Sequence, residues 1–442
     1  MSAPASSGSE VALVRALGVR QLTASIINVT VGAGIFALPA LVAAGLGAAA
    51  PVAFLACGLA MTCIVASFAA AGSRVSLTGG LYAYVEVAFG GYIGYLAGVL
   101  LWLTAILSVS SVAAALTASV GEFLPALNTG PGRVGLLVAV FGGLAVINVR
   151  GVRMGARTVE TLTVAKLLPL LILVGVGVFS IDVANIAWPG WPDGDALGRT
   201  VLLLIFAFVG IEVALVPSGE VKNPAYTVPR AIFLALGITT GLYMAIQLVA
   251  QGVLGPSMSQ YEAAPLAEAA SRFLGNTGRT LMLLGATVSM FGYVSGDMLG
   301  SPRTLFAFGR DGVLPKVFAR IHPEYRTPSV AIIAHAIVAC TVAASSTFQH
   351  LAILSNIALL TLYLLCCVAS WELGRRDVRT DAAPFTFPGE RVVPIIAVAV
   401  IVWILSNATR DEFAVTGAVM ALATVLYLLR RLRAPNRSTA AS

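Results

Sequence analysis

The residues "IINVTVGAGIFALPALVAAGLG", Ile26 to Gly47, form an apolar stretch long enough to cross a lipid bilayer. Three small residues, Gly32-Ala33-Gly34, lie near the middle of the run, and Pro39 follows shortly after them. Glycine and proline weaken a helix, and a helix that only anchored the chain would have no need of them at half depth. The stretch therefore predicts a helix that is interrupted inside the membrane.

The composition of the whole chain indicates that lipid is its main solvent. Of the 442 residues, 58% are hydrophobic and 11% are charged, whereas a soluble domain has about 25% charged residues. The apolar runs lack the alternation of barrel strands, so helices are the expected spanning elements. The sequence predicts twelve spans, near residues 20–45, 50–72, 92–120, 133–149, 158–180, 199–218, 229–254, 280–302, 329–346, 350–371, 392–408 and 412–430.

The distribution of lysine and arginine predicts the orientation of these spans. With both termini in the cytoplasm, nearly all of the 27 basic residues fall in cytoplasmic segments. The opposite face then receives only Arg133, Arg199, Arg272, Arg279 and Arg410. The net charge of +7 is explained by membrane insertion and gives no reason to expect a nucleic-acid partner.

The sequence carries no recognisable catalytic or metal-binding motif. It has three histidines and five cysteines, none with metal-ligand spacing, and it contains neither HExxH nor GxSxG. His335 stands alone in an apolar run and is interpreted as a hydrogen-bonded packing residue. We expect no catalytic residues, no metal and no cofactor, although an intramembrane enzyme is disfavoured rather than excluded.

A second interrupted helix is predicted around "LLLIFAFVGIEVALVPSGEVKNP", residues 202–224, with Gly210 at its centre and Pro217 after it. Breaks at corresponding positions of two five-helix halves are typical of inverted-repeat transporters, whose site lies where the helices unwind. The open N–H groups of one half-helix suit a carboxylate, and the carbonyl end of its partner suits an ammonium group. Packing glycines are the ordinary alternative, but the matched pair of breaks favours a site for a zwitterion.

Three ionisable residues fall within predicted spans, and each requires a partner. Glu212 follows the second break, Lys166 lies in the fifth span and Asp297 in the eighth. A charged side chain at the bilayer centre costs about 2.5–3.5 kcal/mol on insertion scales unless it is paired. A Lys166–Asp297 pair would satisfy the lysine, as would first-span carbonyls together with Ser295, and snorkelling to the interface is a further alternative.

Four motifs resemble the amino acid–polyamine–organocation (APC) superfamily. They are "VGAGIFALP" at 31–39, "SLTGGLYAYVEVAFG" at 76–90, "FAFVGIEVALVPSGEVKNPAYTVPRAI" at 206–232 and "SPRTLFAFGRDGVLPKVFARIHPEYRTP" at 301–328. Their order and spacing match the family over residues 15–330. The resemblance implies an all-α integral membrane protein with twelve transmembrane helices, a LeuT-like five-plus-five inverted repeat followed by two extra helices.

The resemblance also implies a first group of substrate-binding residues. Gly32, Ala33, Gly34 and Ile35 match the unwound first-span segment whose backbone amides hold the substrate carboxylate. The family more often has Ser or Ala before this glycine, and Ala33 removes a possible hydroxyl contact.

A second group follows from the sixth span. Phe206, Ala207 and Phe208 match the segment whose carbonyls receive the substrate amino group and whose aromatic ring covers the pocket, and Gly210 matches the break. Lipid-facing or core packing is the alternative for both phenylalanines. Trp102, Met290, Tyr293 and Ser355 are plausible residues around the substrate side chain, with core packing the more common role for each.

The predicted proton-coupling or gating residues are Glu212, Lys166 and Asp297, the first two from the resemblance and Asp297 from its similar depth on the eighth span. Glu212 matches a glutamate linked to protonation in related exchangers, with a plain bridge between two helices as the alternative. Lys166 matches a lysine whose ammonium group replaces a sodium ion in sodium-independent members. Glu86 is a candidate gate residue, paired with Arg303 or Arg74.

The predicted organisation places a disordered cytoplasmic N-terminus first and two repeats after it. The predicted ranges are 1–14 for the N-terminus, 15–180 and 199–372 for the repeats, 390–431 for the last two spans, and 432–442 for a cytoplasmic tail.

The predicted function is alternating-access transport of an amino acid across the cytoplasmic membrane. We expect sodium-independent proton symport or exchange of a neutral amino acid, with the lipid bilayer and protons as further partners and the oligomeric state left open. A cationic amino acid or polyamine antiporter is the alternative within transport. A solute sensor that does not transport is the alternative from another class.

Overall fold

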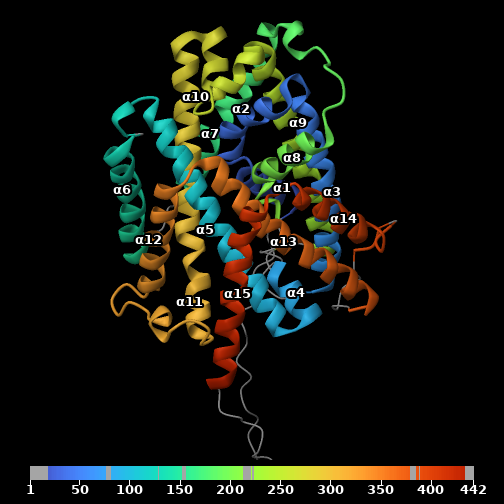
Figure 1. Cartoon of the computed structure of the whole chain (residues 1–442), viewed down its shortest axis with the longest axis vertical. Coiled ribbons are helices and arrows are strands. Elements are labelled where there is room, and N and C mark those ends of the chain that lie inside the picture. The colour runs from blue at the N-terminus through green and yellow to red at the C-terminus, as the bar shows by residue number, and fades with distance from the viewer. Residues whose placement is uncertain are drawn as a thin grey trace, which may run out of the picture.

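The computed structural model describes residues 18–75, 81–127, 129–151, 156–212, 221, 223–378, 385–387 and 389–433, and these residues form an all-α bundle (Figure 1). The predicted N-terminal tail, most of the C-terminal tail, Ser76–Gly80 of the second family motif and the segment 213–220 with Pro217 lie outside the described residues.

The first half of the chain contributes the helices that follow one another from α1 to α7. Their bounds are α1 Val19–Thr30, α2 Gly34–Leu46, α3 Ala50–Arg74, α4 Leu81–Phe89, α5 Gly91–Gly121, α6 Gly130–Val149 and α7 Ala156–Gly177. The long helices are almost uniformly apolar, and α5 and α3 are buried in the centre of the bundle.

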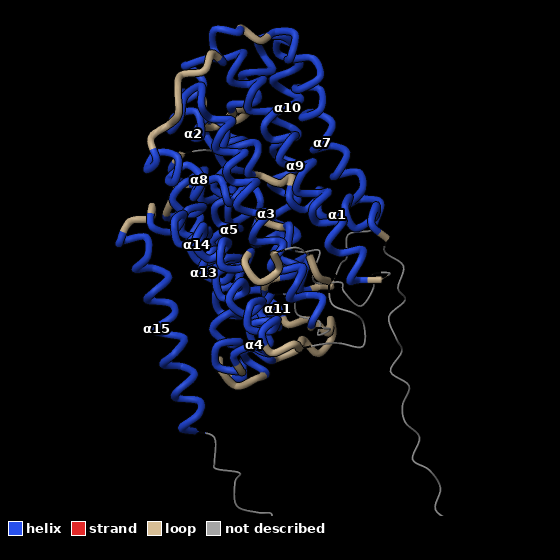
Figure 2. Tube along the Cα trace, turned by 90° about the vertical axis from the view of Figure 1, so that its right-hand side faces the viewer, coloured by secondary structure: helices blue, strands red, loops and turns tan. Residues whose placement is uncertain are grey.

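The second half contributes eight more described helices. Their bounds are α8 Gly194–Phe208, α9 Pro224–Leu254, α10 Pro265–Gly300, α11 Pro302–Arg310, α12 Ser329–Ser345, α13 Phe348–Arg375, α14 Val393–Ser406 and α15 Arg410–Arg433. Gly275 has a left-handed φ of 60° inside α10, so this helix bends after its first three turns. Figure 2 shows α15 running along the outside of the bundle.

Seven helical stretches among the described residues are long and apolar enough to cross a membrane, and α2 and α3 together count as one of them. Three shorter apolar helices accompany them, at Lys166–Ser180, Ser329–Ser345 and Val393–Ser406. The broken helices fall below the length of a span, about 20 residues, because α1 has 12 residues and α8 has 15. A count of spans by helix length therefore does not test the prediction of twelve spans.

The two predicted interruptions are present in the backbone. Between α1 and α2, residues Val31–Ala33 leave the helical path, and Val31 has a ψ of 77°. At the end of α8, Val209 is extended with a ψ of 137°, and Gly210 has a φ of 106°. A residue with a side chain is strained at that φ, so glycine is what permits the turn at this position.

The two interruptions cross each other at close range. A Cβ added to Gly34 would lie 2.9 Å from the Cα of Ala207 in α8, and one added to Gly210 would lie 2.8 Å from Cγ1 of Val29 in α1. Each break thus packs its glycine against the other broken helix. Small residues permit this approach of two backbones, which is how helices associate in a membrane.

Basic side chains gather at one end of the bundle, which we call the basic face. It carries α4, α11 and the loop 311–328, all at the lower end in Figure 1. Arg303, Arg310, Lys316, Arg320 and Arg326 belong to it. The opposite face carries the connections 178–193 and 255–264.

Replacing Gly34 with alanine tests the crossing of the breaks. We expect Gly34→Ala to lower the melting temperature of the purified protein, because the new methyl group would overlap Ala207 and overpacking costs about 1–3 kcal/mol. Gly237→Ala in α9 is the control, since a Cβ there meets no atom within 4 Å. Equal melting temperatures for the two variants would contradict the close crossing.

Candidate functional site

The end of α1 presents backbone carbonyls that its own helix no longer pairs. The ammonium group of Lys166, on α7, donates to the carbonyl of Asn28. The Tyr243 hydroxyl, on α9, donates to the carbonyl of Thr30 at 2.9 Å. Both donors come from unbroken helices, so the neighbouring scaffold satisfies the end of α1.

The start of α2 presents the complementary groups. The first N–H groups of any helix have no intrahelical acceptor, and in α2 they belong to Gly34 and Ile35. Phe36 already donates to the carbonyl of Ala33 at 3.1 Å. Ala33, Gly34 and Ile35 are buried, with Ile35 at 0% exposure. An anion at this helix start would meet open N–H donors and the positive end of the helix dipole.

The end of α8 is held by donors from two neighbouring helices, α9 and α13. The carbonyl of Ala207 accepts from the Tyr243 hydroxyl at 3.0 Å. Asn356, on α13, donates through its side-chain amide to the carbonyls of Leu202 and Leu203 at 2.7 and 3.1 Å. Tyr243 therefore reaches both broken helices with one hydroxyl. Its single proton cannot fully satisfy both carbonyls, which leaves hydrogen-bonding capacity for a cation at this point.

Glu212 connects the second break to α13. Its Oε2 accepts from the N–H of Gly210 at 3.0 Å and from the Tyr363 hydroxyl at 2.9 Å. No cationic partner of Glu212 occurs among the residues that the structure describes. The carboxyl group thus bridges two helices and also fixes the backbone of the glycine at which α8 ends.

The structure decides between the predicted partners of Lys166. The Lys166–Asp297 pair is wrong, because Lys166 donates to a first-span carbonyl, as the alternative prediction had it. Ser295, predicted beside it, has a buried hydroxyl with no partner among the described residues. Asp297 instead lies 2.8 Å from Nε2 of His335. The Lys166 side chain does not extend to the membrane interface, because its ammonium group binds the Asn28 carbonyl near the first break.

The predicted pairing of Glu86 with Arg74 is also wrong. Arg74 is 6% exposed and binds Glu390 at 2.7 Å and Asp377 at 3.5 Å. Glu86 is exposed on α4. Arg74 thus joins the end of α3 to the carboxylates of Asp377 and Glu390, which follow α13, and does not pair with Glu86 on α4.

Both aromatic residues of the second group are buried rather than lipid-facing. Phe208 is 0% exposed and lies edge-on to Tyr243, with 5.5 Å between ring centroids. Phe206 is 7% exposed and lies edge-on to Phe348 at 5.6 Å. The latter contact joins α8 to the first turn of α13 and closes the space beside the second break.

Polar groups suited to a substrate side chain gather between α5, α10 and α13. Ser108 and Ser355 are joined by a hydrogen bond of 2.7 Å, and Tyr293 interacts with Ser108. A Cβ added to Gly32 would lie 4.0 Å from the Tyr293 ring, so this cluster borders the first break. Met290 instead lines a narrow apolar pocket together with Phe36 on the opposite-face side of α2.

Comparison with known proteins identifies the family of this chain. Residues 17–429 match the family described as amino acid permease. The chain belongs to the amino acid permease family. The resemblance to the APC superfamily is thereby confirmed, and the permease is a multi-pass protein of the plasma membrane and a transporter rather than an enzyme.

Several relatives of the permease align over nearly its whole length. It is 29% identical to a methylthioribose transporter of Bacillus subtilis, over 94% of each chain. It is 28% identical to a serine/threonine exchanger of the same organism, over 88% of this chain and 89% of the relative. A branched-chain amino acid permease of B. subtilis is 27% identical, over 91% and 90%.

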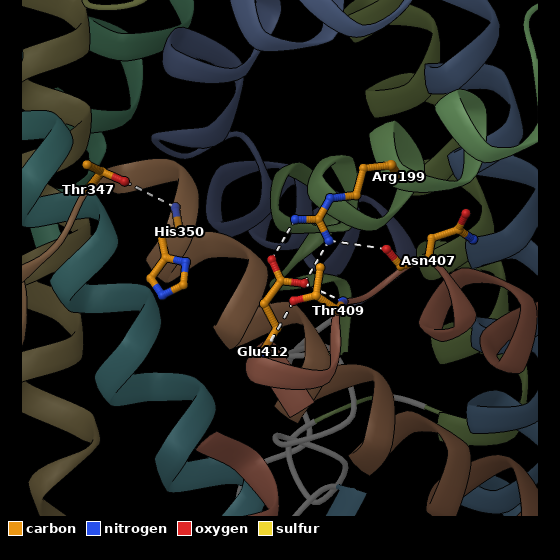
Figure 3. Close-up of polar contacts among 6 residues, drawn as sticks. All are labelled: Arg199, Thr347, His350, Asn407, Thr409 and Glu412. Carbon is orange, nitrogen blue, oxygen red and sulfur yellow. Dashed lines mark hydrogen bonds and ion pairs between the residues drawn. The ribbon is translucent and has the colours of Figure 1, made fainter. Parts of the chain in front are cut away.

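Residues of α15 and of the α14–α15 connection hold the end of α8 that lies near the opposite face. Arg199 binds Glu412 of α15 through two hydrogen bonds of 2.5 and 2.7 Å and also donates to the carbonyl of Asn407 (Figure 3). Thr409 donates its N–H to Glu412 at 2.8 Å. A bidentate arginine–carboxylate pair is geometrically specific, so the α14–α15 connection fixes the start of the second broken helix.

Three functional contacts were not predicted from the sequence of the permease. They involve Tyr243, Tyr363 and Asn356, each a single polar residue within a long apolar helix. A buried tyrosine hydroxyl or amide in lipid requires a partner, so these residues could have been marked as helix-to-helix contacts. Their partners are backbone carbonyls and one carboxylate, which residue types alone do not reveal.

Removing the Tyr243 hydroxyl tests how the two breaks are satisfied. We expect Tyr243→Phe to destabilise the permease by about 1–3 kcal/mol, because buried carbonyls lose their donor. The change would appear as a lower melting temperature and a higher urea sensitivity. Tyr325→Phe, in an exposed loop residue, is the matched control and should change neither. An unaltered Tyr243→Phe protein would mean that other groups satisfy these carbonyls.

Proposed function

We propose that this permease carries a neutral amino acid across the plasma membrane by alternating access, without sodium. The observation that carries the proposal is the crossing of two broken helices, which brings the amide start of α2 and the carbonyl ends of α1 and α8 together. A zwitterion has one charged group for each kind of end. The broken helices would belong to two inverted repeats, at 15–180 and 199–372, in a chain of twelve spans.

The amides of Gly34 and Ile35 would hold the substrate carboxylate, with Gly32 and Ala33 shaping the turn. The carbonyls of Thr30 and Ala207 would receive the ammonium group, for which the Tyr243 hydroxyl is the present partner. Phe206 would cover the bound substrate. The basic face would lie in the cytoplasm with both termini, in accordance with the positive-inside rule.

Sodium independence is supported by the position of Lys166. Its ammonium group binds the Asn28 carbonyl near the first break, where a sodium ion in a coupled transporter would use the same kind of ligand. A fixed positive charge at this point disfavours a second cation.

A neutral substrate is supported by the state of the two carboxyl groups. Glu212 is bound by Gly210 and Tyr363, and Asp297 by His335 and Ser301. Both carboxyl groups therefore already accept hydrogen bonds from the protein among the described contacts, and neither depends on a cationic side chain of a substrate for a partner. Two relatives named above, the serine/threonine exchanger and the branched-chain permease, have neutral amino acids in their names. The hydroxyls of Ser108, Ser355 and Tyr293 favour a small polar side chain.

Ligand binding and uptake test the proposed function together. We expect one class of neutral amino acids to raise the melting temperature of the purified permease and to enter proteoliposomes equally well when sodium is replaced by choline. Binding by lysine, arginine or polyamines alone would favour the antiporter. Binding without uptake would favour a sensor, and strict sodium dependence would overturn the role given to Lys166.

Replacing Glu212 with glutamine separates its two possible roles. Glutamine keeps an acceptor for Gly210 and Tyr363 but cannot bind a proton. We expect uptake by Glu212→Gln to lose part of its dependence on pH while the protein keeps its melting temperature. A variant with the wild-type pH profile would leave Glu212 only as a bridge between helices. Glu324→Gln, in an exposed loop, is the charge-matched control.

A further inference from the structure

Asp297 and His335 form a buried pair on helices other than the broken ones. Nε2 of His335, on α12, lies 2.8 Å from Oδ2 of Asp297, on α10. The His335 side chain is 0% exposed and that of Asp297 is 8% exposed. The Ser301 hydroxyl, just beyond the end of α10, donates to Oδ1 of Asp297 at 2.5 Å. The three side chains therefore form a line from the end of α10 at the basic face into the bundle.

The second ring nitrogen of His335 has no partner among the described residues. In the neutral ring that donates from Nε2, Nδ1 is an unpaired acceptor, and in the other protonation states it is an unpaired donor. Buried polar atoms are rarely left in this condition. The ring of Trp102, on α5, lies edge-on to that of His335 at 6.5 Å between centroids, and its buried N–H is also unpaired there.

Packing alone does not account for this choice of residues. A carboxyl group and an imidazole are expensive to bury, even as a pair, because both lose their hydration. An asparagine and a glutamine would join α10 to α12 by the same hydrogen bond without a charge. What distinguishes the pair from such amides is its ability to gain and lose a proton.

Among the side chains that the structure describes, the main charged or titratable groups on the helices packed against the pair are engaged or exposed. Lys166 on α7 binds Asn28, Tyr243 on α9 binds both breaks, and Glu122, just after α5, binds Arg279. Arg133 on α6 donates to the carbonyls at the end of α12. Arg303 on α11 is exposed.

Tyr293, one turn before Asp297 on α10, interacts electrostatically with it. Its hydroxyl cannot neutralise a carboxylate. His335 is therefore the cation available to Asp297 among the described residues, and it is a cation only when protonated.

We propose that the Asp297–His335 pair is a proton-binding site separate from the amino acid site, loaded from the basic face by way of Ser301. Uptake of one proton from water changes the net charge of the pair from −1 to 0, and its release reverses the change. The proton thereby alters the interaction that joins α10 to α12. The use of this site in the transport cycle rests on the proposed function, but the site itself does not.

Trp102 provides a reporter for the pair. The other four tryptophans, Trp188, Trp191, Trp371 and Trp403, are between 41% and 83% exposed and can be replaced with phenylalanine. In this single-tryptophan permease, purified in nanodiscs, we expect the emission of Trp102 to titrate with pH, because the ring of Trp102 lies edge-on to that of His335. A protonated imidazole quenches an indole ring in contact with it more strongly than a neutral one does.

Two variants assign the titration to the pair. His335→Gln keeps a hydrogen bond to Asp297 but should abolish the titration. Asp297→Asn should move its midpoint by about one pH unit or more, since a carboxylate in contact changes a neighbour's proton affinity by about 1–3 units. His350→Gln is the matched control, because His350 lies at the other end of the bundle near Thr347. A Trp102 emission that does not titrate, or titrates unchanged in His335→Gln, would overturn the proposal.

Uptake assays then separate this proposal from the proposed function. If Trp102 titrates through His335 but no amino acid is taken up, the proton site stands and the transport proposal fails. If uptake occurs, His335→Gln should lose most of the pH dependence of uptake while amino acids still raise its melting temperature. Uptake with an unchanged pH profile in His335→Gln would refute a role of the pair in transport.

Discussion

The hydroxyl of Tyr243 donates to carbonyls of both broken helices, and the arrangement around the breaks depends on this contact. A helix can end inside a bilayer only where other groups replace its lost backbone hydrogen bonds. In this permease those groups come from unbroken neighbours: Tyr243 and Lys166 for α1, and Tyr243 and Asn356 for α8. The helices can therefore end inside the bundle without leaving these carbonyl groups unpaired in lipid.

The constraint explains why glycine occupies the crossing points. Each break approaches the other so closely that a methyl group at Gly34 or Gly210 would overlap its neighbour. Close approach therefore depends on the absence of a side chain at both positions. The open N–H donors of Gly34 and Ile35 have a separate cause, because α2 begins there.

The sequence predicted the features that residue composition determines locally. Both breaks were found from small residues inside apolar runs, and Lys166 was correctly given first-span carbonyls as one of its two partners. The choice between partners failed at Asp297 and Arg74, because several charged residues lay at similar predicted depths. Which of these charged residues meet depends on how each helix is rotated about its own axis. A uniformly apolar sequence has no periodic pattern from which that rotation could be predicted. Counting spans by helix length misses α1 and α8, because both helices are shortened by their breaks.

The position of Glu412 bears on how the second broken helix can move. Its side chain is 7% exposed and binds Arg199 at two points, while a Cβ added to the adjacent Gly198 would lie 2.4 Å from Asn407. Separating α8 from the α14–α15 connection would leave a buried carboxylate unpaired, and this costs more than the pair contributes. A rearrangement of α8 that carries α14 and α15 with it avoids that cost. Any movement of α8 would then include α14 and α15, because Arg199 joins α8 to Asn407 and Glu412.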